Sequence, residues 1–526
     1  MSVLHTLARA EAVAAGRAVP AATVLHRRLS PQPLVLVLLT TAGEAGAPLG
    51  ALAGTDRDAP ELLVVPQPLD RDLRFAFFAG LAEVLLPLLE SYAGQTETEP
   101  ATRNREETEL CSDALQIVVP NTATVDYVRL IGRSTRFLRT ADDPDAPYPV
   151  PAPLPLLGRW LTHYAERART PGSSLLLAMT DLLARHWTTG QSALEDQHLG
   201  ALLGWIDPPP GLDGPAAAAR AETGRARDGL LVSPPAGPAT DPMFDNRVLA
   251  PALSRFDAAR AAGSGIAAAE AEVRRLVESQ LRPVWDDVWH GLDLLRALPE
   301  GAHVAERWKR DRWSFTGHRD RVVAGEPPQP RRDDAIAAAQ KLAGRETAQA
   351  RLAAQEALDD PLALAARRLA GEAFTGVVRE VEMAFSDGRR PMPRPLVTLD
   401  TGDLPQAEPG VRVYRALPEA RSAQPADLVS LDVTPDDPGA RGPAAGGASG
   451  CRITVRLTGG MGNGRTPKEG SVPEPGDVVT FTLFEHDARG GPALPDPEAT
   501  PWTHGGPPGA VAVPDAPDPV TAEDHL

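Results

Sequence analysis

Between Gly301 and Arg332 the chain carries basic and aromatic side chains close together, a combination that could bind nucleic acid. This segment has eight Lys or Arg against four Asp or Glu, a local charge of +4 in a chain of −17. Basic side chains neutralise phosphates, and aromatic rings stack on unpaired bases. The candidate binding residues are Arg307, Trp308, Lys309, Arg310, Arg312, Trp313, His318, Arg319 and Arg321.

The same residue types also suit a seam between domains, where tryptophans fill a groove and arginines pair with carboxylates. The chain contains 70 Asp or Glu, so partner carboxylates are plentiful and the seam is the favoured interpretation. We expect this basic aromatic connector to be loop-like and to follow a helix that ends near Pro299.

A secondary basic face is predicted on a helix that begins after Pro120. Its arginines, Arg129, Arg133 and Arg136, lie opposite the apolar face that holds Tyr127 and Ile131 at helical spacing. They could contact phosphate or the carboxylates of a partner, but a solvated helix face is favoured.

Catalytic and ligand-binding motifs are scarce in the sequence. It contains neither CxxC nor HExxH, no GxSxG and no P-loop, so we expect no metal site and no cofactor. The glycine-rich run Gly459–Gly464 could expose amides to a phosphate, but Pro467 and Pro473 discourage the helix that should follow, which favours a hairpin loop. An enzyme site at the strand ends near Asn121 is kept as an alternative, by analogy with open α/β sheets.

The fold class predicted is a multidomain α+β protein. Short β-prone runs at 34–39, 61–65 and 115–119 predict an N-terminal α/β domain over residues 1–150. Helical spacing predicts a bundle over 151–206, and Pro and Gly predict a linker over 207–240. Residues 241–332 hold a helical segment, whose apolar stripe runs from Val273 to Leu295, and then the connector.

The composition and the hydrophobic pattern of the C-terminal half divide it into three segments. Residues 333–372 are Ala-rich and predict a helical arm of two helices, because Asp360-Pro361 resembles an N-cap followed by proline at the first helical position. Alternating patterns over 373–488 predict six strands in a small antiparallel β-barrel. Residues 489–526 are rich in Pro, Gly and Asp and predict a disordered tail.

The arm and barrel together resemble part of a known family. An Ala-rich helix that runs into Leu369–Met383 (LAGEAFTGVVREVEM), followed by a Pro-Gly turn and a short strand, is similar to the stalk and barrel inserted in the motor domain of superfamily 1B helicases. The resemblance covers residues 333–485, and the helicase motor motifs are absent. It implies a protein that accompanies such an enzyme.

Composition and motifs lead to one functional hypothesis and two alternatives. The acidic charge disfavours long-range attraction to nucleic acid or anionic lipid, and two cysteines without a long apolar run favour a cytoplasmic protein outside the membrane. The leading hypothesis is a non-catalytic adaptor in a nucleic-acid-processing system, with a protein partner such as a helicase or ATPase. The alternatives are direct binding of single-stranded nucleic acid by the connector and barrel, and an enzyme using the N-terminal sheet.

Overall fold

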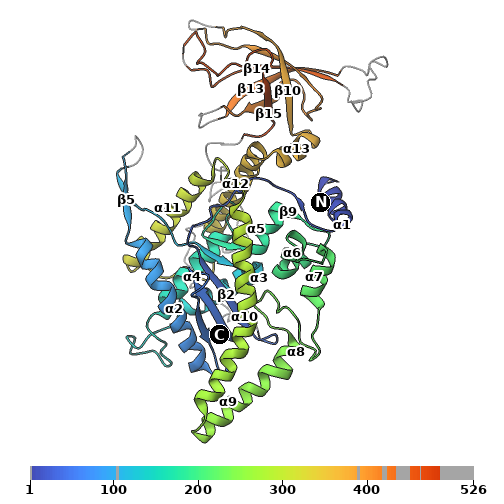
Figure 1. The fold of residues 1–526 in the computed structure, drawn as a ribbon. Helices are drawn as coiled ribbons and strands as arrows, with labels where there is room; N and C mark the ends of the chain where they lie inside the picture. The colour runs from blue at the N-terminus through green and yellow to red at the C-terminus, as the bar shows by residue number, and fades with distance from the viewer. Residues whose placement is uncertain are drawn as a thin grey trace. The chain divides into compact units, whose positions relative to one another are not determined.

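The computed structural model describes residues 3–44, 46–101, 106–387, 391–417, 423–433, 450–462, 464–485 and 494. These residues form two compact units, which meet in the sequence at Lys341 and Leu342 (Figure 1). The multidomain α+β class is confirmed. The predicted tail, 489–526, lies outside the described residues except for Leu494.

A five-stranded mixed sheet forms the centre of the first unit. Its strands, in spatial order, are β4 (Glu61–Val64), β3 (Pro48–Gly54), β2 (Leu34–Thr40), β7 (Ile117–Val119) and β8 (Leu176–Ala178). β2, β7 and β8 are parallel, whereas β2, β3 and β4 are antiparallel. The three predicted strands are confirmed. β3 and β8 were missed, because five of the seven residues of β3 are Gly, Ala or Pro and β8 is only three residues long.

Strand β2 separates two hydrophobic cores. Its residues 35, 37 and 39 face one cluster and residues 34, 36 and 38 face the other. Every residue of the strand is buried, which explains why LVLVLL reads as a continuous apolar run. The central strand of the sheet is therefore covered on both sides.

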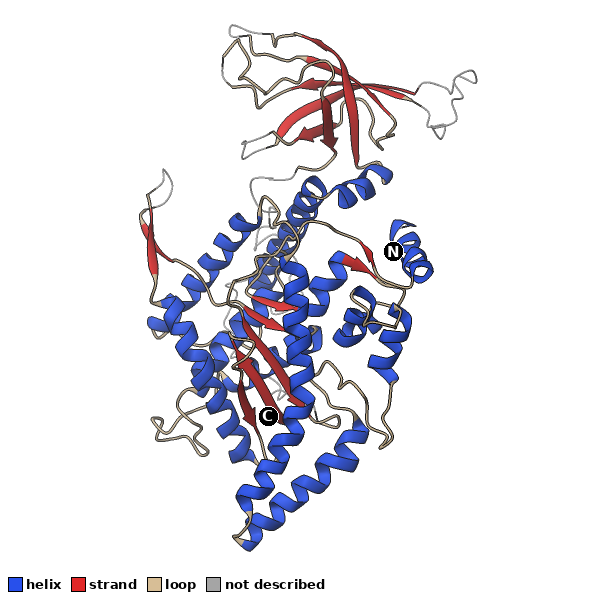
Figure 2. Ribbon diagram, viewed as in Figure 1, coloured by secondary structure: helices blue, strands red, loops and turns tan. Residues whose placement is uncertain are grey.

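Helices cover the two faces of the sheet (Figure 2). The first core packs α10 (Ile266–Arg296), α5 (Met179–His186) and α6 (Leu199–Ile206) against the sheet. The second holds α2 (Arg71–Ala93), α3 (Thr122–Thr135), α4 (Leu154–Ala168) and α11 (Val304–Val323). The predicted apolar stripe of α10 is confirmed, since its members from Val273 to Leu295 are all at most 3% exposed.

Further elements complete the first unit. They are α1 (Val3–Ala15), α7 (Gly214–Thr223), α8 (Pro242–Phe244), α9 (Ala250–Ala262), and the strand pairs β1 (Val19–Pro20) with β9 (Trp187–Thr188) and β5 (Thr96–Glu99) with β6 (Thr108–Cys111). None of the helices in the described residues has both the length and the hydropathy needed to cross a bilayer.

The internal divisions predicted for the first 332 residues differ from the fold. Residues 151–206 do not stand apart as a bundle, because α4 packs on α3 and β8 joins the sheet. The expected linker 207–240 contains α7, whose alanines pack closely on α6. A Cβ on Gly204 would lie 3.1 Å from Ala217 atoms, so the alanines of this segment and the glycine of α6 allow the two helices to touch.

The second unit contains a closed barrel. Its strands follow the order β10 (Ala373–Glu382), β11 (Leu396–Thr401), β14 (Cys451–Leu457), β13 (Gln424–Val433), β12 (Arg412–Arg415) and β15 (Val478–Thr482), with every pair antiparallel. Phe374 and Phe481 stack in its core at 5.6 Å between ring centroids. The six predicted strands and the barrel are confirmed.

The predicted arm is also helical, as α12 (Ala335–Asp359) and α13 (Pro361–Leu369). Asp360 caps α13 as expected, because its carboxylate accepts a hydrogen bond from the Leu362 amide at 2.8 Å. The Pro-Gly turns before β12 and β15 share one conformation, with φ of 97° at both Gly410 and Gly476, a value that glycine adopts without strain.

Candidate functional site

The basic aromatic connector is a helix, α11, where a loop was expected. Five side chains on one face are at most 8% exposed and step by 4, 3, 4 and 3 residues: Val304, Trp308, Asp311, Phe315 and His318. This is the spacing of a helix face that packs against a core. The loop prediction was wrong because Asp311 and His318 occupy two of the five positions and hide the apolar period.

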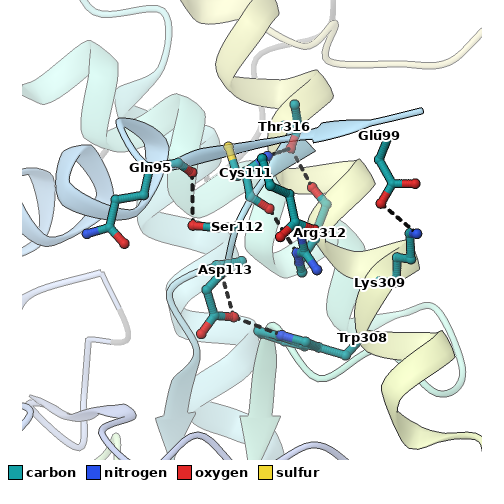
Figure 3. A network of polar contacts seen from close by, with 11 residues as sticks. Gln95, Glu99, Cys111, Ser112, Asp113, Trp308, Lys309, Arg312 and Thr316 are labelled. Carbon is teal, nitrogen blue, oxygen red and sulfur yellow. Dashed lines mark hydrogen bonds and ion pairs between the residues drawn. The ribbon is translucent and has the colours of Figure 1, made fainter. Parts of the chain in front are cut away.

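Two basic residues of α11 pair with the β5–β6 hairpin (Figure 3). Lys309 Nζ lies 2.6 Å from Glu99 Oε1, and Arg312 pairs with Glu97. Arg312 Nε also donates to the Cys111 carbonyl oxygen at 2.8 Å. Because side chains alternate along a strand, Glu97 and Glu99 project from the same face of β5. The hairpin therefore neutralises the two cations.

Three other predicted residues point into the first unit. Trp308 is 8% exposed, and its indole Nε1 donates to Asp113 Oδ1 at 2.8 Å (Figure 3). Arg307 is 7% exposed and donates to the His26 carbonyl oxygen at 3.2 Å. Arg319 donates to the Ala93 carbonyl oxygen at 3.1 Å. The seam interpretation fits these contacts, but the seam lies within one compact unit.

The remaining predicted residues are spread around the helix. Arg310 pairs with Glu306 one turn earlier on α11. Trp313 is half-buried, whereas Arg321 is exposed. The structure therefore distributes the nine candidates among the core, the hairpin contact and solvent, and does not bring them together in one basic groove.

A buried carboxylate joins α11 to the end of α4 and the loop before β8. Asp311 is 0% exposed. It lies 2.6 Å from Arg167 Nη2, and it accepts from Ser173 Oγ at 2.8 Å and from the Ser174 amide at 2.6 Å. A charge removed from water needs such a complete set of partners. The sequence reasoning missed this residue because the partners are 137 to 144 positions away.

Two histidines stack beside this carboxylate network. The rings of His163 on α4 and His318 on α11 are 4.3 Å apart between centroids and 10° from parallel. Burial lowers the pKa of His318 to about 3, with Arg321 and Arg159 adding to the effect. Burial also lowers the pKa of His163 well below its usual value. The neighbouring His318, Arg167 and Arg321 lower this pKa further, by smaller amounts. Both rings are therefore neutral at pH 7.

The secondary basic face is less exposed than predicted. Arg136 is 2% exposed, and its Nε donates to the Gln329 carbonyl oxygen at 3.0 Å. Arg129 and Arg133 are half-buried. The cause is the close packing of α3 on α4, where a Cβ on Gly158 would lie 2.4 Å from the Arg136 amide nitrogen.

The strand ends considered for an enzyme site are filled. Asn121 is 4% exposed, caps α3 by accepting from the Thr124 amide at 3.0 Å, and donates to the Gly237 carbonyl oxygen at 2.8 Å. The chain after Gly237 then covers the end of β2, with the Thr40 amide donating to the Pro238 carbonyl oxygen at 2.7 Å. These contacts count against a substrate site at this edge.

The glycine-rich run lies in the loop that follows β14. Gly460 and Gly462 have φ of 74° and 83°. Residues 458–462 and 392–394 line a cavity of about 250 Å³ at this end of the barrel. Sequence reasoning singled out the glycines but could not find the opposite wall, because 392–394 precede a different strand.

Comparison with known proteins gives no relative: no protein-family model, no curated protein and no solved structure matches the chain. Within the described ranges, no group of three or more His, Cys, Asp or Glu side chains is placed to hold a metal ion. Cys111 and Cys451 are both buried thiols.

We expect the full chain to bind a fluorescent 20-nucleotide oligo(dT) with a dissociation constant weaker than about 10⁻⁴ M at physiological salt, the weak end of nonspecific binding. The reason is that carboxylates of the same unit neutralise Lys309, Arg310 and Arg312. Fluorescence anisotropy measures the constant. Tighter binding that weakens steeply with salt, and that is lost in an Arg310→Ala/Arg312→Ala variant, would restore the nucleic-acid alternative.

Proposed function

We propose that this chain is a non-catalytic adaptor of a nucleic-acid-processing system and that its barrel docks on a protein partner. The observation that carries the proposal is an apolar pair on the outer face of the barrel. Val377 on β10 and Val478 on β15 are direct cross-strand neighbours, and they are 48% and 69% exposed. Their side chains thus form one continuous apolar contact surface.

A polar row continues from this apolar pair around the barrel. Val377 lies opposite Asp400, Asp400 opposite Arg452, and Arg452 opposite Asp432 on successive strands. Arg452 Nε lies 3.1 Å from Asp400 Oδ1. An apolar centre beside charged, solvent-exposed groups has the composition of a protein interface, in which burial gives affinity and the rim gives specificity.

The class of partner follows from the resemblance of residues 333–485 to the helicase insert. That resemblance supports a helicase or ATPase as the partner. The internal pairing of the α11 cations supports protein docking over direct nucleic-acid binding, because ion pairs within the unit would have to break before phosphates could replace the carboxylates.

A photo-crosslinking experiment tests the proposal. A benzophenone amino acid at position 478 of the full chain should crosslink to a protein in the native host, and mass spectrometry identifies it. With that partner purified, a Val377→Asp/Val478→Asp variant should bind at least about tenfold more weakly, a loss of about 1.4 kcal/mol. Isothermal titration calorimetry measures the change.

The matched control is Val323→Asp, because Val323 is 81% exposed but lies at the end of α11 in the other unit. It should leave the affinity unchanged. Equal affinity of the double variant and the parent would refute docking through the valine pair, and crosslinks from position 478 to nucleic acid would favour the direct-binding alternative.

A further inference from the structure

The cavity at the end of the barrel holds an arginine that pairs with no carboxylate in the part of the chain that the structure describes. Arg394, in one wall, donates to the Pro393 carbonyl oxygen at 2.9 Å. No Asp or Glu among the described residues forms an ion pair with it. This differs from α11, whose Lys309 and Arg312 both pair with glutamates. In a chain of net charge −17, a cation in a cavity that pairs with none of the described carboxylates favours a site for an anion from outside.

Two backbone N–H groups in the opposite wall are also without acceptors in the described structure, those of Gly460 and Gly462. The carbonyl of Gly459 accepts from Gln424 Nε2 at 3.2 Å, and the carbonyl of Met461 accepts from the Lys468 amide at 2.9 Å. In a trans peptide the N–H points opposite to the carbonyl of the same plane. Both N–H groups therefore point away from these partners, in a glycine-rich loop of the kind that binds anions.

The size and the apolar walls of the cavity limit which ligands it can bind. About 250 Å³ is less than the roughly 300–1,000 Å³ typical of pockets for drug-sized ligands, so the cavity would enclose only one end of a larger ligand. Met392, Pro393 and Met461 line the cavity and would contact an apolar group.

We infer that this cavity binds the C-terminal carboxylate of a peptide whose last residue is apolar. The carboxylate would accept hydrogen bonds from Arg394 and from the N–H groups of Gly460 and Gly462, as terminal carboxylates do in backbone nests. The last side chain would lie against Met392 and Met461. The inference extends the proposed docking function of the barrel to a second surface, but its test needs only short peptides and is independent of the valine pair.

One NMR signal reports on the cavity in the full chain. Met461–Gly462 is the only Met-Gly pair in the sequence, so labelling methionine with ¹³C at the carbonyl and glycine with ¹⁵N isolates the Gly462 amide. We expect this signal to shift and saturate with acetyl-Gly-Ser-Gly-Ser-Leu bearing a free carboxylate. The same peptide with a C-terminal amide should leave the signal in place.

Substitution of Arg394 completes the test. Arg394→Gln should weaken binding of the free-acid peptide at least tenfold, whereas Arg412→Gln, in the same barrel and paired with Asp427 at 3.5 Å, should not. The inference is overturned if the amide peptide binds as well as the acid, if neither shifts the signal, or if inorganic phosphate alone binds as tightly as the peptide. The last result would identify a phosphate site.

Discussion

Asp311→Ala should lower the free energy of unfolding of the first unit by about 3–5 kcal/mol, the loss that follows when one partner of a buried ion pair is removed. The carboxylate is 0% exposed. Its removal leaves Arg167, the Ser173 hydroxyl and the Ser174 amide without their acceptor. Asp311→Asn keeps the shape and one acceptor oxygen, so its cost should be smaller.

Urea unfolding followed by tryptophan fluorescence measures this loss, because all seven described tryptophans lie in the first unit. Asp320→Ala is the matched control on the same helix: the Asp320 side chain is 58% exposed, and its replacement should change stability by less than about 0.5 kcal/mol. A cost for Asp311→Ala below about 1 kcal/mol would show that the buried network contributes little to the stability of the unit.

Acid should destabilise the first unit through His163 and His318. Both have folded-state pKa values below the ordinary 6.5, about 3 for His318. Above pH 6.5 the rings are neutral in both states and stability does not depend on them. As the pH falls below 6.5, the unfolded chain takes up protons that the folded unit does not, so stability declines by about 1.4 kcal/mol per pH unit for each histidine.

The measurement compares the parent with a His163→Phe/His318→Phe variant between pH 6 and 5. The parent should lose about 2–3 kcal/mol per pH unit more than the variant. Burial raises the pKa of Asp287 to about 7, so protonation of this carboxyl stabilises the folded unit as the pH falls. Asp287 is present in both proteins, and the difference between their slopes therefore reports on the two histidines. Equal slopes of unfolding free energy against pH in the two proteins would show that His163 and His318 take up protons in the folded unit as readily as in the unfolded chain.

The fold was largely predictable where apolar residues repeat at the regular spacing of a strand or a helix. The barrel followed from alternation in strands such as CRITVRL, in which buried residues alternate with exposed or half-buried ones. The stripe of α10 followed from its spacing. Prediction failed where a polar residue occupies a core position, as in α11, and where small residues form close contacts, as in β3 and α7. The spacing of apolar residues does not indicate which residue, far away in the sequence, pairs with a buried charge.

The candidate sites were less predictable than the fold. The connector residues were identified by type, but their role depends on where Glu97, Glu99 and Asp113 lie, and these are about 200 positions earlier in the chain. The cavity needs both 392–394 and 458–462, which come together only because β11 and β14 are neighbours in the barrel. Local sequence carries no information on that pairing.

The polar positions in the buried face of α11 also fix its register. The 4, 3, 4, 3 spacing nearly repeats itself after seven residues, so an apolar face alone would allow the helix to dock two turns away. Such a slip would place Val304 where Asp311 now accepts from the Ser174 amide, and Asp311 where His318 stacks on His163. A buried donor would lose its acceptor and a carboxylate would enter the histidine position, so the observed docking of the helix is the one that keeps Asp311 with its partners.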